Sequence, residues 1–248
     1  MILIKSDSEI ELMYESGQIT GGALALAEES IRPGMTTGEL DSLIEKYIRS
    51  HGARPSFKNY NGFPASACIS VNEVIVHGIP GNRVLKEGDI VSVDVGSYYK
   101  GYHSDAARTF AVGNVTEEAK KLIEVTKQSF FEGIKAAYPG MRIGDIGSRI
   151  QSYAESFGYG VVRDMVGHGI GRALHEAPDV PNFGTSGRGI RLLEGMCIAV
   201  EPMINEGTYE LKTLSDGWTT VTLDGKLSAH YENTLAITKD GPRILTLI

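Results

Sequence analysis

The 248-residue chain lacks several features that would place it in other protein classes. It contains no run of about 18 apolar residues, the length that a membrane span needs. Its first residues, MILIKSDSE, become charged after four positions, which is not the pattern of a signal peptide. We therefore expect a cytoplasmic protein that has no membrane partner.

Cysteine is scarce, since Cys68 and Cys197 are the only two. Both lie in apolar runs, so we expect buried thiols in a reducing compartment and no disulfide. The formal net charge is −7 without any block of like charge. This balance argues against a nucleic-acid footprint over most of the surface, although a local basic patch stays open, and we expect no specific nucleic-acid partner.

Two helices are predicted at the start of the chain. The first begins near Ser6–Ser8 and runs towards Ser30, and the second follows a Thr36–Glu39 capping box and ends at His51. Its buried face is expected to hold Leu40, Leu43, Ile44, Tyr47 and Ile48. Glycines weaken an isolated helix, so we expect close packing against a neighbour at Gly17, Gly21 and Gly22 of the first helix. Strands are expected at Ala67–Val71 and Val74–Val76.

The segment Glu87–Phe110 predicts two strands joined by a turn at Tyr98–Gly101. Asp94 lies in the middle of the first strand and Asp105 in the return strand. Burying one ionised carboxylate is costly without a cation or donors, and burying two side by side costs more. Each aspartate alone is more often an edge or turn residue, so a metal or catalytic role requires a second observation.

That second observation is an internal repeat. The motif PGMTTGEL at Pro33–Leu40 recurs as PGMRIGDI at Pro139–Ile146, and EGDIVSVD at Glu87–Asp94 recurs as EGMCIAVE at Glu194–Glu201. The two pairs are offset by 106 and 107 residues. We interpret them as a duplicated unit of two helices and strands. Residues 1–248 would then form a single catalytic domain with pseudo-symmetric halves of about 1–113 and 114–248.

The duplication supplies two more carboxylates and is accompanied by a histidine. Glu201 takes the mid-strand position of Asp94, and Glu232 lies in a return strand over His230–Thr238, as Asp105 does in the first half. His168 lies among glycines in VGHGIGRALHEAP. Alone it would more often be a core or loop histidine, and the glycines match neither a P-loop nor a dinucleotide fingerprint.

Four carboxylates and one imidazole predict a divalent metal site. Such ligands suit Mn²⁺, Fe²⁺, Co²⁺ or Zn²⁺ better than thiolates would. One cation would leave two excess negative charges, whereas two cations balance four carboxylates and can share a hydroxide. Paired ions about 3.5–4 Å apart are an established arrangement for hydrolysis. A mononuclear site is the open alternative.

The chain resembles the type I methionine aminopeptidases over essentially its whole length. The motifs that carry the resemblance are VHGIP (Val76–Pro80), DIVSVDVG (Asp89–Gly96), GYHSDAARTF (Gly101–Phe110), GHGIGRALHE (Gly167–Glu176), EPMI (Glu201–Ile204) and YENT (Tyr231–Thr234). The resemblance implies an α+β pita-bread fold, in which helices cover a curved, mainly antiparallel central sheet. The absence of an N-terminal extension and of a long insertion before Glu201 favours type I.

The resemblance also implies a role for each ligand. Asp94 would be a terminal ligand of one ion, Asp105 and Glu232 would bridge both ions, and His168 and Glu201 would hold the other. Glu201 would in addition shuttle the proton of the attacking water.

Other residues would contact the substrate. His175 would steady the tetrahedral intermediate, and His77 would contact the peptide beyond the scissile bond. The methionine pocket would be formed by Tyr60, Phe63, Cys68 and Trp218, although each alone is more often a core residue. A monovalent cation, Na⁺ or K⁺, would be held mainly through backbone carbonyls at Asn72, Val74 and Ser228.

The predicted function is hydrolysis of the initiator methionine from nascent proteins whose second residue is small. The expected partners are N-terminal Met peptides and nascent chains, with a transient ribosome contact left open, and we expect a monomer. One alternative is an Xaa-Pro aminopeptidase or prolidase of the same fold, although those enzymes generally carry an additional N-terminal domain. The other is a non-catalytic binding module, which would be expected to have lost metal ligands.

Overall fold

The computed structural model describes residues 2–247, which form helices and short strands in alternating groups. The helices are α1 (Asp7–Ser30), α2 (Thr37–Ser50), α3 (Glu117–Ile134), α4 (Ile143–Glu155) and the 3₁₀ helix η1 (Tyr60–Gly62). The strands of the first part are β1 (Arg54–Pro55), β2 (Ala67–Val71), β3 (Val74–Val76), β4 (Ile90–Tyr99) and β5 (Tyr102–Ala111). The later strands are β6 (Gly160–Val161), β7 (Gly167–Gly169), β8 (Glu176–Val180), β9 (Cys197–Val200), β10 (Met203–Asn205), β11 (Leu211–Thr213), β12 (Thr220–Thr222), β13 (Ser228–His230), β14 (Asn233–Thr238) and β15 (Gly241–Ile244).

The predicted hairpin is confirmed as β4 and β5, the longest strands in the described range. Its two-residue turn, Lys100 and Gly101, has positive φ at both positions, as a type I′ turn requires. Asp94 lies opposite Ala107, and Gly96 lies opposite Asp105. Since opposed residues point to one side of a sheet, Asp94 and Asp105 are diagonal neighbours on the same face.

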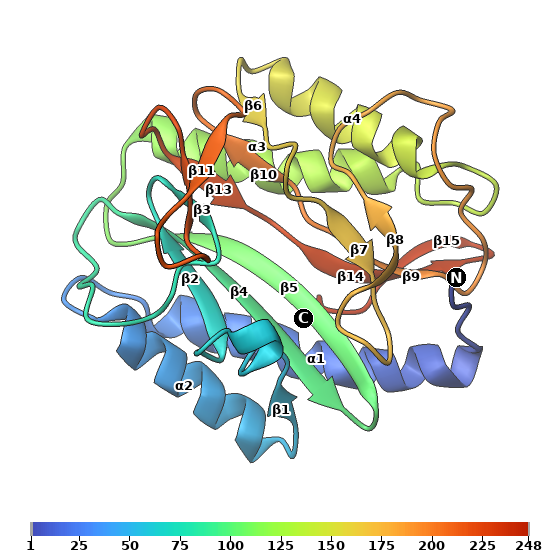
Figure 1. The fold of residues 1–248 in the computed structure, drawn as a ribbon, viewed down its shortest axis with the longest axis horizontal. Coiled ribbons are helices and arrows are strands. Elements are labelled where there is room, and N and C mark those ends of the chain that lie inside the picture. The colour runs from blue at the N-terminus through green and yellow to red at the C-terminus, as the bar shows by residue number, and fades with distance from the viewer. Residues whose placement is uncertain (1, 248) are drawn as a thin grey trace.

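The helices begin where the sequence predicts. Ser6 caps α1 and Thr36 caps α2, each through a reciprocal capping box. The two helices lie in the lower half of Figure 1 and α3 with α4 in the upper half, with β4, β5 and β14 between them. One prediction for α2 was wrong, because Leu43 is 36% exposed and does not join the core. Helices α3 and α4 form the second pair that the duplication predicts.

Glycines in α1 allow the close packing that the sequence predicts. A Cβ at Gly17 would overlap the carbonyl of Leu245, and one at Gly22 would overlap the hydroxyl of Tyr47. Gly17 thus lets α1 approach the segment after β15, and Gly22 lets it approach α2. Helix α1 also packs against both strands of the central hairpin.

A second, five-stranded sheet has the order β15-β14-β9-β7-β8. The sequence-based placement of Glu201 in mid-strand was wrong, because β9 ends at Val200 and Pro202 has no N–H with which to continue the ladder. The continuous strand expected over 230–238 is divided into β13 and β14. Glu232 lies in this break, where its N–H and C=O both pair with Ala107 of β5.

The pairing of Glu232 with Ala107 joins the two sheets at their centre. Separate apolar clusters lie under α1 and α2 and around α3 and α4. On the basis of these paired helices and clusters, we propose two pseudo-symmetric halves, near 1–113 and 114–248, within a single domain. Within residues 2–247, no helix is both long and apolar enough to cross a bilayer.

We predict that Gly17→Ala destabilises the protein by about 1–3 kcal/mol, because the new methyl group overpacks the contact with Leu245. Helix propensity alone predicts the opposite sign, a gain of about 1 kcal/mol. Gly81→Ala is the control, since a Cβ there meets open space. Urea unfolding of the three proteins measures the difference, and a Gly17→Ala variant at least as stable as the parent would contradict this packing.

Candidate active site and metal centre

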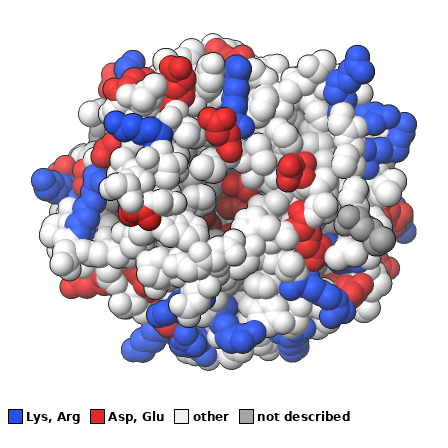
Figure 2. Space-filling view, viewed as in Figure 1, with Lys and Arg blue, Asp and Glu red and all other residues white. Residues whose placement is uncertain are grey.

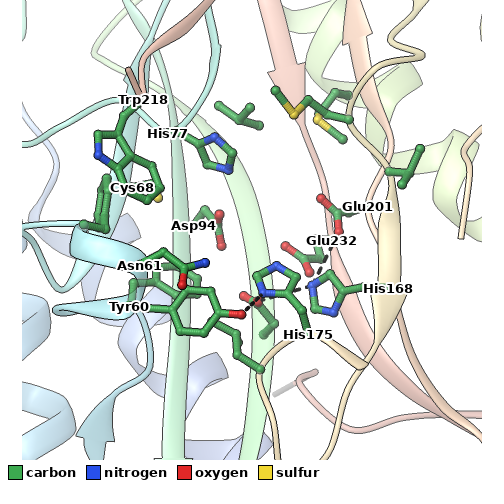
Figure 3. A pocket seen from close by; sticks show the side chains of 18 residues that line it. Tyr60, Asn61, Cys68, His77, Asp94, His168, His175, Glu201, Trp218 and Glu232 are labelled. Carbon is green, nitrogen blue, oxygen red and sulfur yellow. Dashed lines mark hydrogen bonds and ion pairs between the residues drawn. The ribbon is translucent and has the colours of Figure 1, made fainter. Parts of the chain in front are cut away.

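A cavity of about 290 Å³ is lined by side chains from residues 57–105 and from residues 165–232. Figure 2 shows acidic atoms deep in a central hollow of this face, whereas Lys and Arg lie mainly around the periphery. All five predicted metal ligands line the cavity: Asp94, Asp105, His168, Glu201 and Glu232. In Figure 3 the carboxylates of Asp94, Glu201 and Glu232 and the ring of His168 point towards a common centre. The structure therefore brings together every ligand that the repeat and the motifs single out.

The imidazole of His168 is oriented for ligation. Its Nδ1 lies 2.9 Å from the carbonyl oxygen of Gly169, which can only accept, so Nδ1 carries the proton. Its Nε2 lies 3.9 Å from Asp105 Oδ2 and 3.8 Å from Glu201 Oε1. Burial lowers the pKa of His168 to about 3, which keeps the ring neutral. The lone pair of Nε2 therefore faces the carboxylates.

The carboxylates are crowded and short of hydrogen-bond donors. Burial raises the pKa of Asp94 to about 7. Burial first, and then the charge of Asp94, raise the pKa of Asp105 and of Glu201 well above the usual range. Burial and the charge of Asp105 do the same for the pKa of Glu232. Among residues 2–247, no hydrogen-bond partner contacts Asp94 Oδ1, Asp105 Oδ1 or Glu232 Oε1, so these buried oxygens fit the coordination of cations.

Hydrogen bonds to the backbone hold predicted ligands from distant parts of the chain together. The hydroxyl of Thr234 accepts from the N–H of Asp105 and donates to its C=O. Arg108 donates to the carbonyl of Glu232 and to the side chain of Asn233, and its guanidinium stacks on Tyr231 at 4.2 Å. These contacts place Asp105 and Glu232 at one point without any bond to their carboxylates.

The wall of the cavity contains the predicted substrate-binding residues. Tyr60, Phe63, Cys68, His77, His175 and Trp218 all line it. Phe63 meets Trp218 edge to face with ring centroids 5.2 Å apart, and His77 lies 6.2 Å from Trp218. Tyr60 Oη lies 2.8 Å from His175 Nδ1. If the tyrosine hydroxyl donates this bond, Nε2 of His175 keeps its proton and can donate to a substrate oxygen.

The loop that carries His175 is tied to the start of the chain. Lys5 Nζ lies 2.6 Å from Glu176 Oε2, and the two side chains are only 5% and 6% exposed. Glu176 also accepts from the N–H of Ala173. Sequence reasoning missed this pair, because its members lie 171 residues apart and no local pattern links them.

Other lining residues were also missed. They are apolar or uncharged side chains, namely Asn61, Val76, Met165, Val166 and Met203, together with Phe57 and Leu174, for which no role was assigned. Met203 follows Glu201 by two positions in the EPMI motif, a signal that could have identified it. His230 was missed as well; its ring lies beside Glu201 and Glu232.

The residues predicted to hold a monovalent cation lie near one another. Asn72 has φ of 58° and its C=O accepts from the N–H of Ser228. Its side chain bonds to Asp89 and to the N–H of Ile90. Val74 lies two residues further along the chain, in β3. The cation itself stays a prediction.

The sequence of this chain is similar to those of known metallopeptidases. The model of metallopeptidase family M24 matches residues 11–239. The methionine aminopeptidase of Clostridium perfringens is 60% identical over 248 residues, all of both chains. The chain belongs to the methionine aminopeptidases of family M24. Methionine aminopeptidase 1 of Bacillus subtilis is 49% identical over the full length of both chains.

Solved structures confirm the expected α+β pita-bread fold of the methionine aminopeptidases. The crystal structure of methionine aminopeptidase from Rickettsia prowazekii has a TM-score of 0.98 and 44% identity, and each chain is fully covered. The prolidase from Pyrococcus furiosus has a TM-score of 0.81 and 26% identity, and the match covers 99% of this chain but 65% of that one. The fold is thus shared with prolidases, whereas sequence identity favours the methionine aminopeptidases.

The buried acids and histidines make opposite contributions to the pH dependence of stability. An acid with a raised pKa holds its proton more tightly in the folded chain. Its contribution to the free energy of unfolding therefore falls as pH rises towards the folded pKa. A histidine whose pKa is lowered in the folded chain contributes stability that increases as pH rises. This increase ends at the ordinary histidine pKa of 6.5. Burial lowers the pKa of His77, His103, His168, His175 and His230. Above pH 6.5 the contribution of the acids therefore dominates.

We predict that metal-free protein loses thermal stability over the pH window above 6.5, because each extra proton held by the folded state costs about 1.4 kcal/mol per pH unit. Saturating Co²⁺ should remove this loss, since its charge stabilises the ionised carboxylates. Calorimetric melting at fixed ionic strength measures both curves. Glu232→Gln should reduce the slope, and a metal-free melting temperature that stays constant across this window would contradict the crowding of the acids.

Proposed function

We propose that the protein removes the N-terminal methionine from nascent chains whose second residue is small. The observation that carries this proposal is the position of the acidic cluster, at the bottom of a cavity whose opposite wall is aromatic. A free N-terminal amine is attracted to the acidic floor, and the first side chain then lies against the wall. Membership in the methionine aminopeptidases supports the same substrate.

The cluster fits two divalent cations. Asp94 would hold one ion, Asp105 and Glu232 would bridge, and His168 and Glu201 would hold the other. Two such charges balance four carboxylates and would satisfy their buried oxygens. We propose Co²⁺, Fe²⁺, Mn²⁺ or Zn²⁺, which accept mixed carboxylate and imidazole ligands. When bound, the pair would lower the pKa of a shared water and polarise the scissile carbonyl.

The protein side chains supply proton transfer and orientation. Glu201 lies at the end of β9 with one oxygen near His168, where it can take the proton of the attacking water and pass it to the leaving amine. His175 would donate to the oxygen of the tetrahedral intermediate. His77 would contact the peptide beyond the scissile bond. Both histidines border the same cavity, so each can reach a substrate that is bound there.

The snug wall explains the preference for methionine. We propose that Tyr60, Phe63, Cys68 and Trp218 surround its unbranched side chain, which fills irregular apolar space well. Burial raises the pKa of Cys68, so its thiol is neutral and acts as a small apolar group. We further propose that the enzyme is a type I member that works as a cytoplasmic monomer, with a transient ribosome contact and a Na⁺ or K⁺ ion at Asn72, Val74 and Ser228.

A paired peptide assay tests the substrate. Metal-stripped protein reconstituted with each ion in turn should cleave Met-Ala-Ser and leave Ala-Pro peptides intact. Chelation should abolish the cleavage, and the ion that restores it best indicates the working metal. Cleavage of the Ala-Pro peptide alone would instead identify a prolidase-like enzyme.

We predict that Glu201→Gln lowers kcat by at least about 100-fold, the range expected for loss of a general acid–base. The fold should survive, because the change removes one charge from a crowded cluster. Circular dichroism and the melting temperature of metal-free protein provide the control. Retention of more than about half of the parent kcat would rule out the assigned role.

We predict that Tyr60→Phe lowers kcat about five- to tenfold, because one hydrogen bond to His175 is worth about 1 kcal/mol. KM should change less, since the ring that faces the methionine side chain stays. Steady-state kinetics on Met-Ala-Ser separates the two effects. An unchanged kcat with a raised KM would show that Tyr60 serves the pocket alone.

A further inference from the structure

His230 is a second buried imidazole beside the carboxylate cluster. It is 2% exposed and lies at the end of β13. Its Nε2 lies 4.0 Å from Glu201 Oε2 and 3.8 Å from Glu232 Oε2. Among residues 2–247, this nitrogen has no hydrogen-bond partner. A buried, unpaired nitrogen is costly, so its position calls for a physical reason.

The backbone of His230 is held in place independently of its ring. The hydroxyl of Thr109 donates to the C=O of His230 and accepts from its N–H. Thr109 has only one proton to donate, so Ser92, at 2.8 Å, must donate to it. Two neighbouring strands, β4 and β5, thereby fix the backbone of the residue whose Nε2 faces the acids.

The distances indicate a shared cation better than a direct hydrogen bond. A hydrogen bond from Nε2 to a carboxylate would be about 2.7–2.9 Å long, well below both distances. Two ligand atoms on one tetrahedral ion with bonds of about 2.1 Å lie roughly 3.4 Å apart. The observed gaps approach this spacing. The set Glu201, His230 and Glu232 has ligand atoms close enough together to hold an ion, as does the set Asp105, His168 and Glu232.

The arrangement around Glu201 repeats on its two sides. Its Oε1 faces His168 Nε2 at 3.8 Å, and its Oε2 faces His230 Nε2 at 4.0 Å. His168 borders the substrate cavity, whereas His230 borders a separate cavity that Arg108 and Thr109 also line. The two rings therefore approach the carboxylate from different directions.

We propose that His230 is an additional nitrogen ligand of a divalent cation held between Glu201 and Glu232. The inference rests on the proposed metal centre and adds a sixth side chain to it. A second imidazole makes the centre richer in nitrogen, which favours Zn²⁺, Fe²⁺ or Co²⁺ over the more oxygen-seeking Mn²⁺.

The first test counts ligating imidazoles in the unaltered protein. The chain has six histidines, and their ring nitrogens can be resolved in the full-length protein labelled with ¹⁵N-histidine. Titration with Zn²⁺ should move two Nε2 resonances, those of His168 and His230, to the range of metal-bound nitrogen. A single moved resonance, that of His168, would overturn the proposal.

The second test uses His230→Gln, with His103→Gln as the matched control. His103 is a half-buried histidine that bonds to Ser56 and lines a different cavity from the acids. His230→Gln should weaken one of the Co²⁺ binding events at least about tenfold by calorimetry and alter the visible Co²⁺ spectrum. The control should bind Co²⁺ like the parent. Parent-like affinity and spectrum in His230→Gln would show that the ring only lies near the ligands.

These outcomes separate this inference from the proposed function. Cleavage of Met-Ala-Ser by a protein with only one ligating imidazole would refute the role of His230 and leave the function standing. Failure to cleave the peptide would refute the function whatever the ligand count. If His230→Gln does not fold, the imidazole count in the unaltered protein decides alone.

Discussion

Repulsion among four crowded carboxylates, two of them buried and two half-buried, governs how this structure is built. Ionised acids at this depth are stable only when cations or donors compensate them, and the hydrogen-bond donors here are few. Such a cluster does not stabilise a protein by itself, so its presence indicates a metal-binding or catalytic role. The rigid hairpin β4–β5 and the capped helices behind it hold Asp94 and Asp105 against this repulsion.

Backbone pairing brings distant parts of the chain together at this cluster. Glu232 leaves the ladder of its own sheet and pairs through its backbone with Ala107, and Thr234 pairs with Asp105. Acids from distant parts of the chain are thus placed by hydrogen bonds to their backbone groups, which do not depend on the ionisation of the side chains. Further out, the ion pair of Lys5 and Glu176 fixes the loop that presents His175.

Much of the site was predictable because its signals are local or repeated. Alternation along β4 placed Asp94, and the duplicated motifs led from Asp94 to Glu201. The ends of the strands were not predictable, because the break at Glu232 results from pairing with β5, more than a hundred residues away. The partnership of Lys5 with Glu176 has the same non-local origin. His230 did leave a signal, since it precedes Glu232 by two positions, the spacing that puts side chains of an extended chain on one face.

Anomalous diffraction from crystals of the Co²⁺-loaded protein shows whether cations compensate the acidic cluster. Data on either side of the cobalt edge locate the ions without any assumption about activity. We expect two peaks about 3.5–4 Å apart among Asp94, Asp105, His168, Glu201 and Glu232. Absence of any ordered ion among these side chains, in crystals that hold cobalt elsewhere, would contradict this expectation.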